Sequence, residues 1–204
     1  MSKNLIITFI RNPELGKVKS RLAKSIGEVS ALDVYKILLK HTEHVLHNLD
    51  CDKAVYYSVK IREHDIWDPE IYQKHKQEGE DLGVRMQNAF KNGFLSGYEK
   101  IIIVGSDLYD LSPEIINKAF KELDNHDSVI GPAEDGGYYL LGMKTLHPSV
   151  FNVKNWGTNT VYKQTISHLA NHNMYVLEIL NDIDTIEDLQ PYNIFKSYVE
   201  QLKY

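Results

Sequence analysis

Short apolar runs alternate along the chain with longer segments in which apolar residues recur every three or four positions. The run Asn4–Ile10, "NLIITFI", predicts a first strand, and "KIIIVG", 100–105, is apolar at successive positions, as in a strand buried on both faces. Between them, "GEVSALDVYKILLKHTEHVLHNL", 27–49, has the spacing of an amphipathic helix. This alternation predicts an α/β fold with a mainly parallel central sheet and helices on both faces.

The rest of the chain continues the alternation. Ser112 and Pro113 have the residue types of an N-cap and a first helical position, so a helix is expected to begin there. The closing segment, 185–202, is predicted to be a helix interrupted near Pro191. The other predicted strands are 53–59, 71–77, 127–133, 136–143 and 174–180, and the other predicted helices are 82–97, 112–126 and 158–172.

Composition and charge are those of an ordinary globular protein and exclude some classes. The 204 residues are expected to form one domain over 1–204. The formal net charge of −5 gives no support for nucleic-acid binding, and the single cysteine, Cys51, excludes an intrachain disulfide. The first apolar run is too short for a membrane span and unlike a signal peptide, so a cytoplasmic location is expected.

Acidic residues directly follow two of the apolar strands. Asp107 and Asp110 come after "IIIV", whereas Asp182 and Asp184 come after "MYVLEIL". Because ligands of parallel α/β sheets bind beyond the carboxyl ends of the strands, these acids are expected at the ligand edge. A carboxylate in this position has to be solvated, hydrogen-bonded or bound to a cation. Asp110 has a second explanation, because it leads into the helix cap at Ser112.

A cluster of basic residues lies between the first strand and the helix that follows it. Arg11, Lys17, Lys19 and Arg21 fall within eleven residues, and Gly16 lets the backbone approach a ligand closely. These cations suit a phosphate group, although a solvated basic turn explains the same composition. The loop matches neither the Walker pattern nor the dinucleotide-binding glycine pattern.

Two glycine-containing segments add candidate ligand contacts. In "EGEDLGVRM", 78–86, Asp81 has the residue type of an N-cap and Arg85 lies in the first helical turn, so the segment by itself resembles a capped helix start. In "GPAEDGGYYLLG", 131–142, Asp135 precedes Gly136 and Gly137. A hairpin turn explains the glycines but not the acids beside them, which favours a close approach of the backbone to a ligand.

Three histidines recur every three residues on the predicted long helix, at positions 41, 44 and 47. Such spacing can mimic a metal-binding face, because residues three apart are neighbours on a helix. No acid or cysteine stands beside them at a convincing ligand spacing, so a solvated helix face is the interpretation.

Five segments carry a resemblance to a known family. "PELGKVKSRL", "DLGVRM", "GSDLYDL", "GPAEDGGYYLLG" and "DIDTIEDL" occur in this order in a bacterial family of GT-A-fold transferases, which the chain resembles from Leu5 to about Leu189. Members of this family are described as glycosyltransferase-like or left uncharacterised. The chain is similar, more distantly, to molybdenum-cofactor guanylyltransferases and phospholactate guanylyltransferase. The resemblance implies a nucleotide-binding α/β sandwich, in agreement with the alternation of elements.

The resemblance also implies a role for individual residues. Asp107 would be the catalytic acid that binds a metal, and Asp184 would approach the same metal from another strand. The acceptor or the sugar would lie beside Asp135, Gly136 and Gly137. The nucleotide and its phosphates would be bound by Arg11, Gly16, Lys17, Arg21, Asp81 and Arg85. The chain departs from many relatives at Tyr109, where they have a proline, which puts the shape of that loop in doubt.

These observations together predict a metal-dependent transferase with a nucleotide-activated donor and a small-molecule acceptor. The usage of the family favours glycosyl transfer from a nucleotide sugar. The cationic loop favours the alternative of nucleotidyl transfer, in which a nucleoside triphosphate releases pyrophosphate. A nucleotide-binding regulatory domain without turnover is a third possibility, against which the pair Asp107 and Asp184 argues. The cofactor is predicted to be Mg²⁺ or Mn²⁺, since hard cations prefer oxygen ligands.

Overall fold

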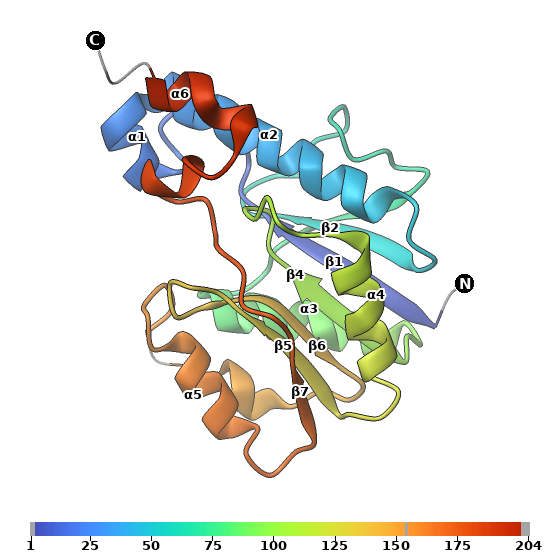
Figure 1. Ribbon diagram of the computed structural model, residues 1–204. Helices are drawn as coiled ribbons and strands as arrows, with labels where there is room; N and C mark the ends of the chain where they lie inside the picture. Colours follow the sequence, from blue (N-terminus) through green and yellow to red (C-terminus); the bar gives the residue numbers. More distant parts are fainter. Residues whose placement is uncertain (1–2, 154, 201–204) are drawn as a thin grey trace.

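The computed structural model describes residues 3–153 and 155–200, which are built around one seven-stranded sheet (Figure 1). The strand order is β3-β2-β1-β4-β6-β5-β7, and β6 alone runs antiparallel to both of its neighbours. The predicted α/β fold with a mainly parallel sheet is therefore confirmed. The strands are β1 (Asn4–Ile10), β2 (Asp52–Tyr57), β3 (Tyr72–Lys76), β4 (Lys100–Val104), β5 (Ser128–Pro132), β6 (Tyr138–Met143) and β7 (Met174–Val176).

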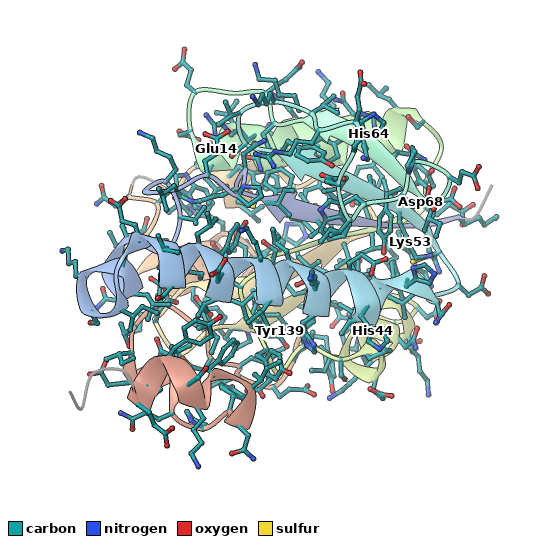
Figure 2. The ribbon with its side chains drawn as sticks, turned by 90° about the horizontal axis from the view of Figure 1, so that it is seen from above. Glu14, His44, Lys53, His64, Asp68 and Tyr139 are labelled. Carbon is teal, nitrogen blue, oxygen red and sulfur yellow. The ribbon has the colours of Figure 1, made fainter. Side chains whose placement is uncertain are left out.

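Helices cover both faces of the sheet, because the central strands are apolar on both sides. In β4, Ile102 and Val104 pack under α2 and α4, whereas Ile101 and Ile103 pack under α3 and α5. Figure 2 looks onto the first of these faces, across which α2 extends. The helices are α1 (Ser20–Ile26), α2 (Glu28–His47), α3 (Leu82–Leu95), α4 (Pro113–Glu122), α5 (Val161–His168) and α6 (Lys196–Glu200), with 3-10 turns η1 (Pro148–Phe151), η2 (Glu187–Leu189) and η3 (Asn193–Phe195).

Local capping chemistry sets the start of two helices as the sequence predicts. The Ser112 hydroxyl accepts a hydrogen bond from the Ile115 N–H at 3.5 Å, and Pro113 is the first residue of α4. The Asp81 carboxylate accepts from the Val84 N–H at 2.9 Å at the start of α3. Both caps satisfy backbone donors that have no partner inside the helix.

The last part of the chain differs from the prediction of a strand over 174–180 followed by a helix interrupted near Pro191. Strand β7 pairs with β5 over only three residues, and two 3-10 turns and the short α6 replace the helix. The reason is tertiary packing: Ile183, Leu189 and Phe195 are buried against α1 and α2, which an extended path allows and a continuous helix does not. We call residues 177–195 the C-terminal strap; in Figure 1 it rises in orange and red from β7 to α1.

The topology collects the loops of the predicted site at one edge of the sheet. The loops after β1, β4 and β5 and the strap after β7 all begin at carboxyl ends of strands that run in the same direction. The antiparallel β6 begins at this edge, so the segment around Gly136 also lies there. Within residues 3–153 and 155–200, none of the helices combines the length and apolar composition that crossing a membrane requires.

Candidate functional site

The strap is fastened to the loop that follows β4, which brings two acidic segments side by side. The Ile183 N–H donates to the Asp107 carbonyl at 2.9 Å, and Leu108 and Asp182 form an isolated antiparallel bridge. Asp107 and Asp184 therefore approach the same point from segments that are far apart in the sequence. Their convergence at the carboxyl edge agrees with the sequence prediction.

The group at the meeting point of these acids is the ammonium of Lys19. Its Nζ lies 3.1 Å from Oδ2 of Asp107 and 3.4 Å from Oδ1 of Asp184. The Lys19 side chain is only 4% exposed, whereas the Asp107 and Asp184 side chains are 43% and 41% exposed. The second oxygen of Asp184 is 3.3 Å from Nη1 of Arg21. One buried cation thus bridges two carboxylates that face solvent on their other side.

The backbone of Lys19 has an unusual conformation that directs this contact. With φ 47° and ψ 48°, Lys19 is the one non-glycine residue with positive φ in the described part of the chain. Such a left-handed conformation costs about 1–2 kcal/mol for a residue with a side chain. Strain of this kind persists where surrounding contacts enforce it, and it is common at functional sites. In the sequence, Lys19 is one of four cations of the basic loop, and nothing there distinguishes it from its neighbours.

The ammonium also sets the charge state of Asp107. Burial by itself raises the pKa of this carboxyl, but the charge of Lys19 and the hydrogen bond from it have the opposite effect. The resulting pKa lies below the ordinary value for an aspartate, and Arg11 contributes in the same direction. Asp107 is therefore ionised near neutral pH and available as an acceptor or a metal ligand.

Asp182 is a further acid of the site that the sequence analysis did not select. Burial raises the pKa of its carboxyl to about 8, and the neighbouring charges of Asp107 and Asp135 act in the same direction. Its Oδ1 is buried without a hydrogen-bond partner in the described part of the structure. The position of Asp182 after a strand was the available signal, but its burial beside Asp107 arises only in the tertiary structure.

The carboxylate oxygens of the site fit a hard divalent cation whose coordination is completed by phosphate oxygens. Mg²⁺ commonly binds through one or two carboxylates together with substrate phosphates, and Asp107 and Asp184 offer two. The buried, unpartnered oxygen of Asp182 is a further oxygen beside them. Among the described residues, no three His, Cys, Asp or Glu side chains are grouped so that the protein alone holds a metal ion. The residues therefore suit a metal ion that binds together with a phosphate-containing ligand.

The basic loop presents its cations in two different ways. Arg11 and Lys17 are exposed at the end of β1 and beyond it, whereas Arg21 is exposed but directed at Asp184. Gly16 has a φ of 70°, which a glycine adopts without strain. The buried hydroxyl of Tyr35 accepts from the Arg11 N–H at 2.9 Å and lies 3.4 Å from the Ser106 hydroxyl. Tyr35 thereby ties the basic loop to the loop that carries Asp107.

The two glycines after Asp135 have different requirements. Gly136 has a φ of 87°, and a Cβ there would lie 2.3 Å from the backbone oxygen of Asn159. Gly137 has an ordinary φ, and its Cβ would meet only the Asp135 side chain, at 3.0 Å. The Asp135 carboxylate is exposed and accepts from the Gly137 N–H at 2.7 Å. Gly136, rather than Gly137, is therefore the position that tolerates no side chain.

Asp81 and Arg85 make local contacts at the end of β3. Asp81 caps α3, and Nε of Arg85 donates to the Gly79 carbonyl at 3.0 Å. Arg85 also lines a surface cavity of about 240 Å³ together with Tyr56, Glu78 and other residues of β3 and α3. A contact of Asp81 and Arg85 with a nucleotide remains a prediction.

His41 and Tyr109 form a contact that the sequence did not indicate. Nε2 of His41 lies 2.9 Å from the Leu111 carbonyl, and its ring centroid is 4.6 Å from that of Tyr109. Tyr109 also packs edge-on against Tyr192 and Phe195 of the strap. The interpretation of a solvated histidine face is therefore wrong for His41, because the loop after β4 folds onto α2. Tyr109 gives this loop an aromatic anchor.

Asp188 holds the turn of the strap that presents Asp184. Its Oδ2 accepts from the N–H groups of Asp184 and Thr185 at 2.9 and 2.7 Å and from the Thr185 hydroxyl at 2.9 Å. The Thr185 hydroxyl donates to Asp188 and does not itself cap a helix. The aspartate side chain takes over because η2 begins only at Glu187.

An Asp188→Ala variant is expected to lose about 2–3 kcal/mol of unfolding free energy, because the N–H groups of the turn lose a charged acceptor. It is also expected to weaken metal-dependent ligand binding, since Asp184 is no longer held. Urea unfolding and a metal-binding titration measure the two effects. Glu187→Ala, which removes an exposed acid from the same turn, is the matched control. Equal stability of both variants would contradict the role of Asp188.

Comparisons with known proteins agree with this geometry. Residues 41–158 match the DUF2064 family, described as an uncharacterized protein conserved in bacteria. No curated protein matches the chain. A crystal structure from Desulfovibrio desulfuricans G20, named as a "putative nucleotide-diphospho-sugar transferase", is 33% identical, with a TM-score of 0.86 over 100% of this chain and 95% of that chain.

Two more distant structures share the fold. The 4-diphosphocytidyl-2C-methyl-D-erythritol synthase from Anaerococcus prevotii DSM 20548 is 13% identical, with a TM-score of 0.57 over 95% of this chain and 98% of that chain. Rv0371c from Mycobacterium tuberculosis H37Rv, in complex with manganese, is 13% identical, with a TM-score of 0.53 over 93% of this chain and 97% of that chain. At these identities the likeness concerns the fold alone. From the family match and the 33% identical structure, we conclude that the chain belongs to the DUF2064 family of bacterial proteins and has the fold of a nucleotide-diphospho-sugar transferase.

Proposed function

We propose that the protein is a metal-dependent transferase that binds a nucleotide sugar at the carboxyl edge of its sheet and transfers the glycosyl group to a small-molecule acceptor. The observation that carries this proposal is the convergence of Asp107 and Asp184 on one ammonium group. Two ionised carboxylates held side by side suit a divalent cation that also binds phosphate. All of the proposed site residues border one sheet, in keeping with a single nucleotide-binding domain.

Different residues of the site bind the donor and the acceptor. Asp107 and Asp184 would hold Mg²⁺ or Mn²⁺, which would supply positive charge to the departing nucleoside diphosphate. Arg11 and Lys17, exposed beside them, bind phosphate oxygens through charge-assisted hydrogen bonds. The backbone turn at Gly136 and the exposed Asp135 form the side of the site that receives the acceptor.

The acidity of the site favours a diphosphate donor over a triphosphate. The exposed Asp135 carboxylate adds to the negative charge of Asp107 and Asp184, while Lys19 and Arg21 are already engaged by these two acids. A triphosphate brings more negative charge to the same place, which costs more repulsion. Nucleotidyl transfer is the second candidate, because Arg11 and Lys17 are exposed cations with no ion pair within the described residues.

The identity of the product tests the reaction. The protein is incubated with Mn²⁺ and a panel of nucleotide sugars or nucleoside triphosphates, chosen by a thermal-shift screen, since ligands that bind the native state raise its stability. Release of a nucleoside diphosphate supports glycosyl transfer, and release of pyrophosphate supports the second candidate. Nucleotide binding without any turnover across the panel would favour a regulatory domain. A lack of nucleotide binding would contradict the whole proposal.

A Lys17→Ala variant is expected to bind nucleoside diphosphates about tenfold more weakly or worse, because a charge-assisted hydrogen bond contributes roughly 1.5–3 kcal/mol. The loss is expected to be smaller for monophosphates and absent for nucleosides, which isothermal titration calorimetry can compare. Lys24→Ala removes a basic residue of the last turn of α1 and serves as the control. An equal loss of affinity for nucleosides and nucleotides would count against a phosphate contact.

A further inference from the structure

We propose that the Lys19 ammonium is a built-in competitor of the divalent cation. It occupies the space between Asp107 and Asp184 until the phosphates of the donor attract it, so that the metal binds together with the nucleotide and not before it. This inference rests on the proposed function, because it concerns how the same two carboxylates exchange one cation for another. It assigns Lys19 as a positioning residue that controls the order of binding.

The geometry places the ammonium where a bridging ion has to lie. Nζ is within 3.4 Å of an oxygen from each carboxylate, so an ion that bridges Asp107 and Asp184 cannot coexist with it at that point. Repulsion between the ammonium and a divalent ion opposes binding even at a neighbouring position. The contact is also protected, because the Lys19 side chain is 4% exposed. Metal binding to the ligand-free protein therefore requires displacement of an internal cation.

The backbone of Lys19 is fixed at the start of α1, and only its side chain has to move to release the carboxylates. The Lys19 carbonyl accepts from the Ala23 N–H at 2.8 Å, which fixes the start of α1. A flexible four-carbon stem carries the ammonium, so rotation of the side chain is sufficient to leave the carboxylates. Arg11 and Lys17 of the same loop are exposed at the edge, where phosphates are expected. Phosphates bound there give the ammonium a second set of anionic partners close to the first.

The test measures Mn²⁺ binding in the absence of nucleotide, by the loss of the electron paramagnetic resonance signal of free Mn²⁺. Lys19→Gln removes the charge and keeps most of the side chain, and it is expected to bind Mn²⁺ at least tenfold more tightly than the unmodified chain. Lys19→Asn is the second variant, because asparagine tolerates the left-handed backbone of this position. Lys24→Gln removes a charge from the last turn of α1, and its Mn²⁺ affinity is expected to stay within about twofold.

The double variant Lys19→Gln, Asp107→Asn tests whether the additional Mn²⁺ affinity of Lys19→Gln depends on Asp107. We expect the double variant to lose this additional affinity. Circular dichroism confirms that each variant is folded. Equal Mn²⁺ affinity of the unmodified chain and both Lys19 variants would overturn the proposal, and so would a gain that persists in the double variant. These measurements contain no nucleotide, so they decide on Lys19 independently of the proposed function. A failure of the unmodified chain to bind any nucleotide contradicts the proposed function instead.

Discussion

Replacing Asp107 with asparagine is expected to reduce metal-dependent nucleotide binding and turnover by about 100-fold or more. The substitution removes one of the two carboxylates that are proposed to hold the metal, whereas changes to mere supporting groups of metal sites already cost about 10–100-fold. The fold is expected to survive, because the asparagine carbonyl can still accept the hydrogen bond that Lys19 donates to Asp107. Calorimetric titration of a nucleoside diphosphate with and without Mn²⁺ measures the loss.

Asp110→Asn is the matched control, three residues along the same loop. Asp110 is exposed and accepts a hydrogen bond from the Tyr192 hydroxyl at 2.6 Å, away from Lys19. Its replacement is expected to change nucleotide affinity by less than about threefold, since an exposed contact of this kind contributes little. Equal losses for the two variants would show that the general charge of the loop, and not the position of Asp107, determines binding.

Gly136→Ala is expected to destabilise the fold by about 3 kcal/mol and to eliminate turnover. A side chain at a φ of 87° costs about 1–2 kcal/mol. The added Cβ would also lie 2.3 Å from the Asn159 oxygen, and relief of such an overlap by backbone movement costs roughly 1–3 kcal/mol. The movement would displace the turn that borders the acceptor side. Thermal unfolding and the product assay measure the two consequences.

Gly137→Ala, one residue further, separates the backbone requirement from the glycine content of the turn. Gly137 has no positive φ, and the nearest atom to its Cβ belongs to the movable Asp135 side chain. We expect a loss of less than about 1 kcal/mol and substantial residual activity. If Gly137→Ala were as damaging as Gly136→Ala, the cause would be the ligand's approach to the glycine pair and not the contact with Asn159.

The fold was largely predictable because its information is local. The buried strand β4 and the caps at Asp81 and Ser112 follow from apolar runs and from side chains that satisfy nearby N–H groups. The C-terminal strap was not predictable in the same way. Its periodicity suggested a helix, but burial of Leu189 and Phe195 against α1 and α2 overrides this local preference.

The candidate site was likewise predictable only in part. Strand direction places Asp107 and Asp184 at the same edge of the sheet, so topology was sufficient to predict this edge. Their position side by side depends on the hydrogen bond from the Ile183 N–H to the Asp107 carbonyl. Lys19 could not be distinguished from three other cations, because its left-handed backbone and its burial arise only in the tertiary structure. Gly136 and Gly137 are the same residue type, so the sequence does not show which of them requires glycine. The backbone of Asn159, which excludes a side chain at Gly136, approaches it only in the tertiary structure.

The strap makes half of the proposed metal site dependent on a docking equilibrium. Asp184 stands on a segment that pairs regularly with the sheet over only three residues and is then held by isolated backbone hydrogen bonds to the loops after β4 and β5, by side-chain packing and by Asp188. Segments of this kind commonly open at a free energy well below that of global unfolding. Each opening would remove one carboxylate while the sheet and Asp107 remain in place. The apparent affinity for the ligand would then decrease as the fraction of molecules with a closed strap decreases. Hydrogen exchange in residues 177–195 would therefore report the fraction of molecules that can bind the ligand.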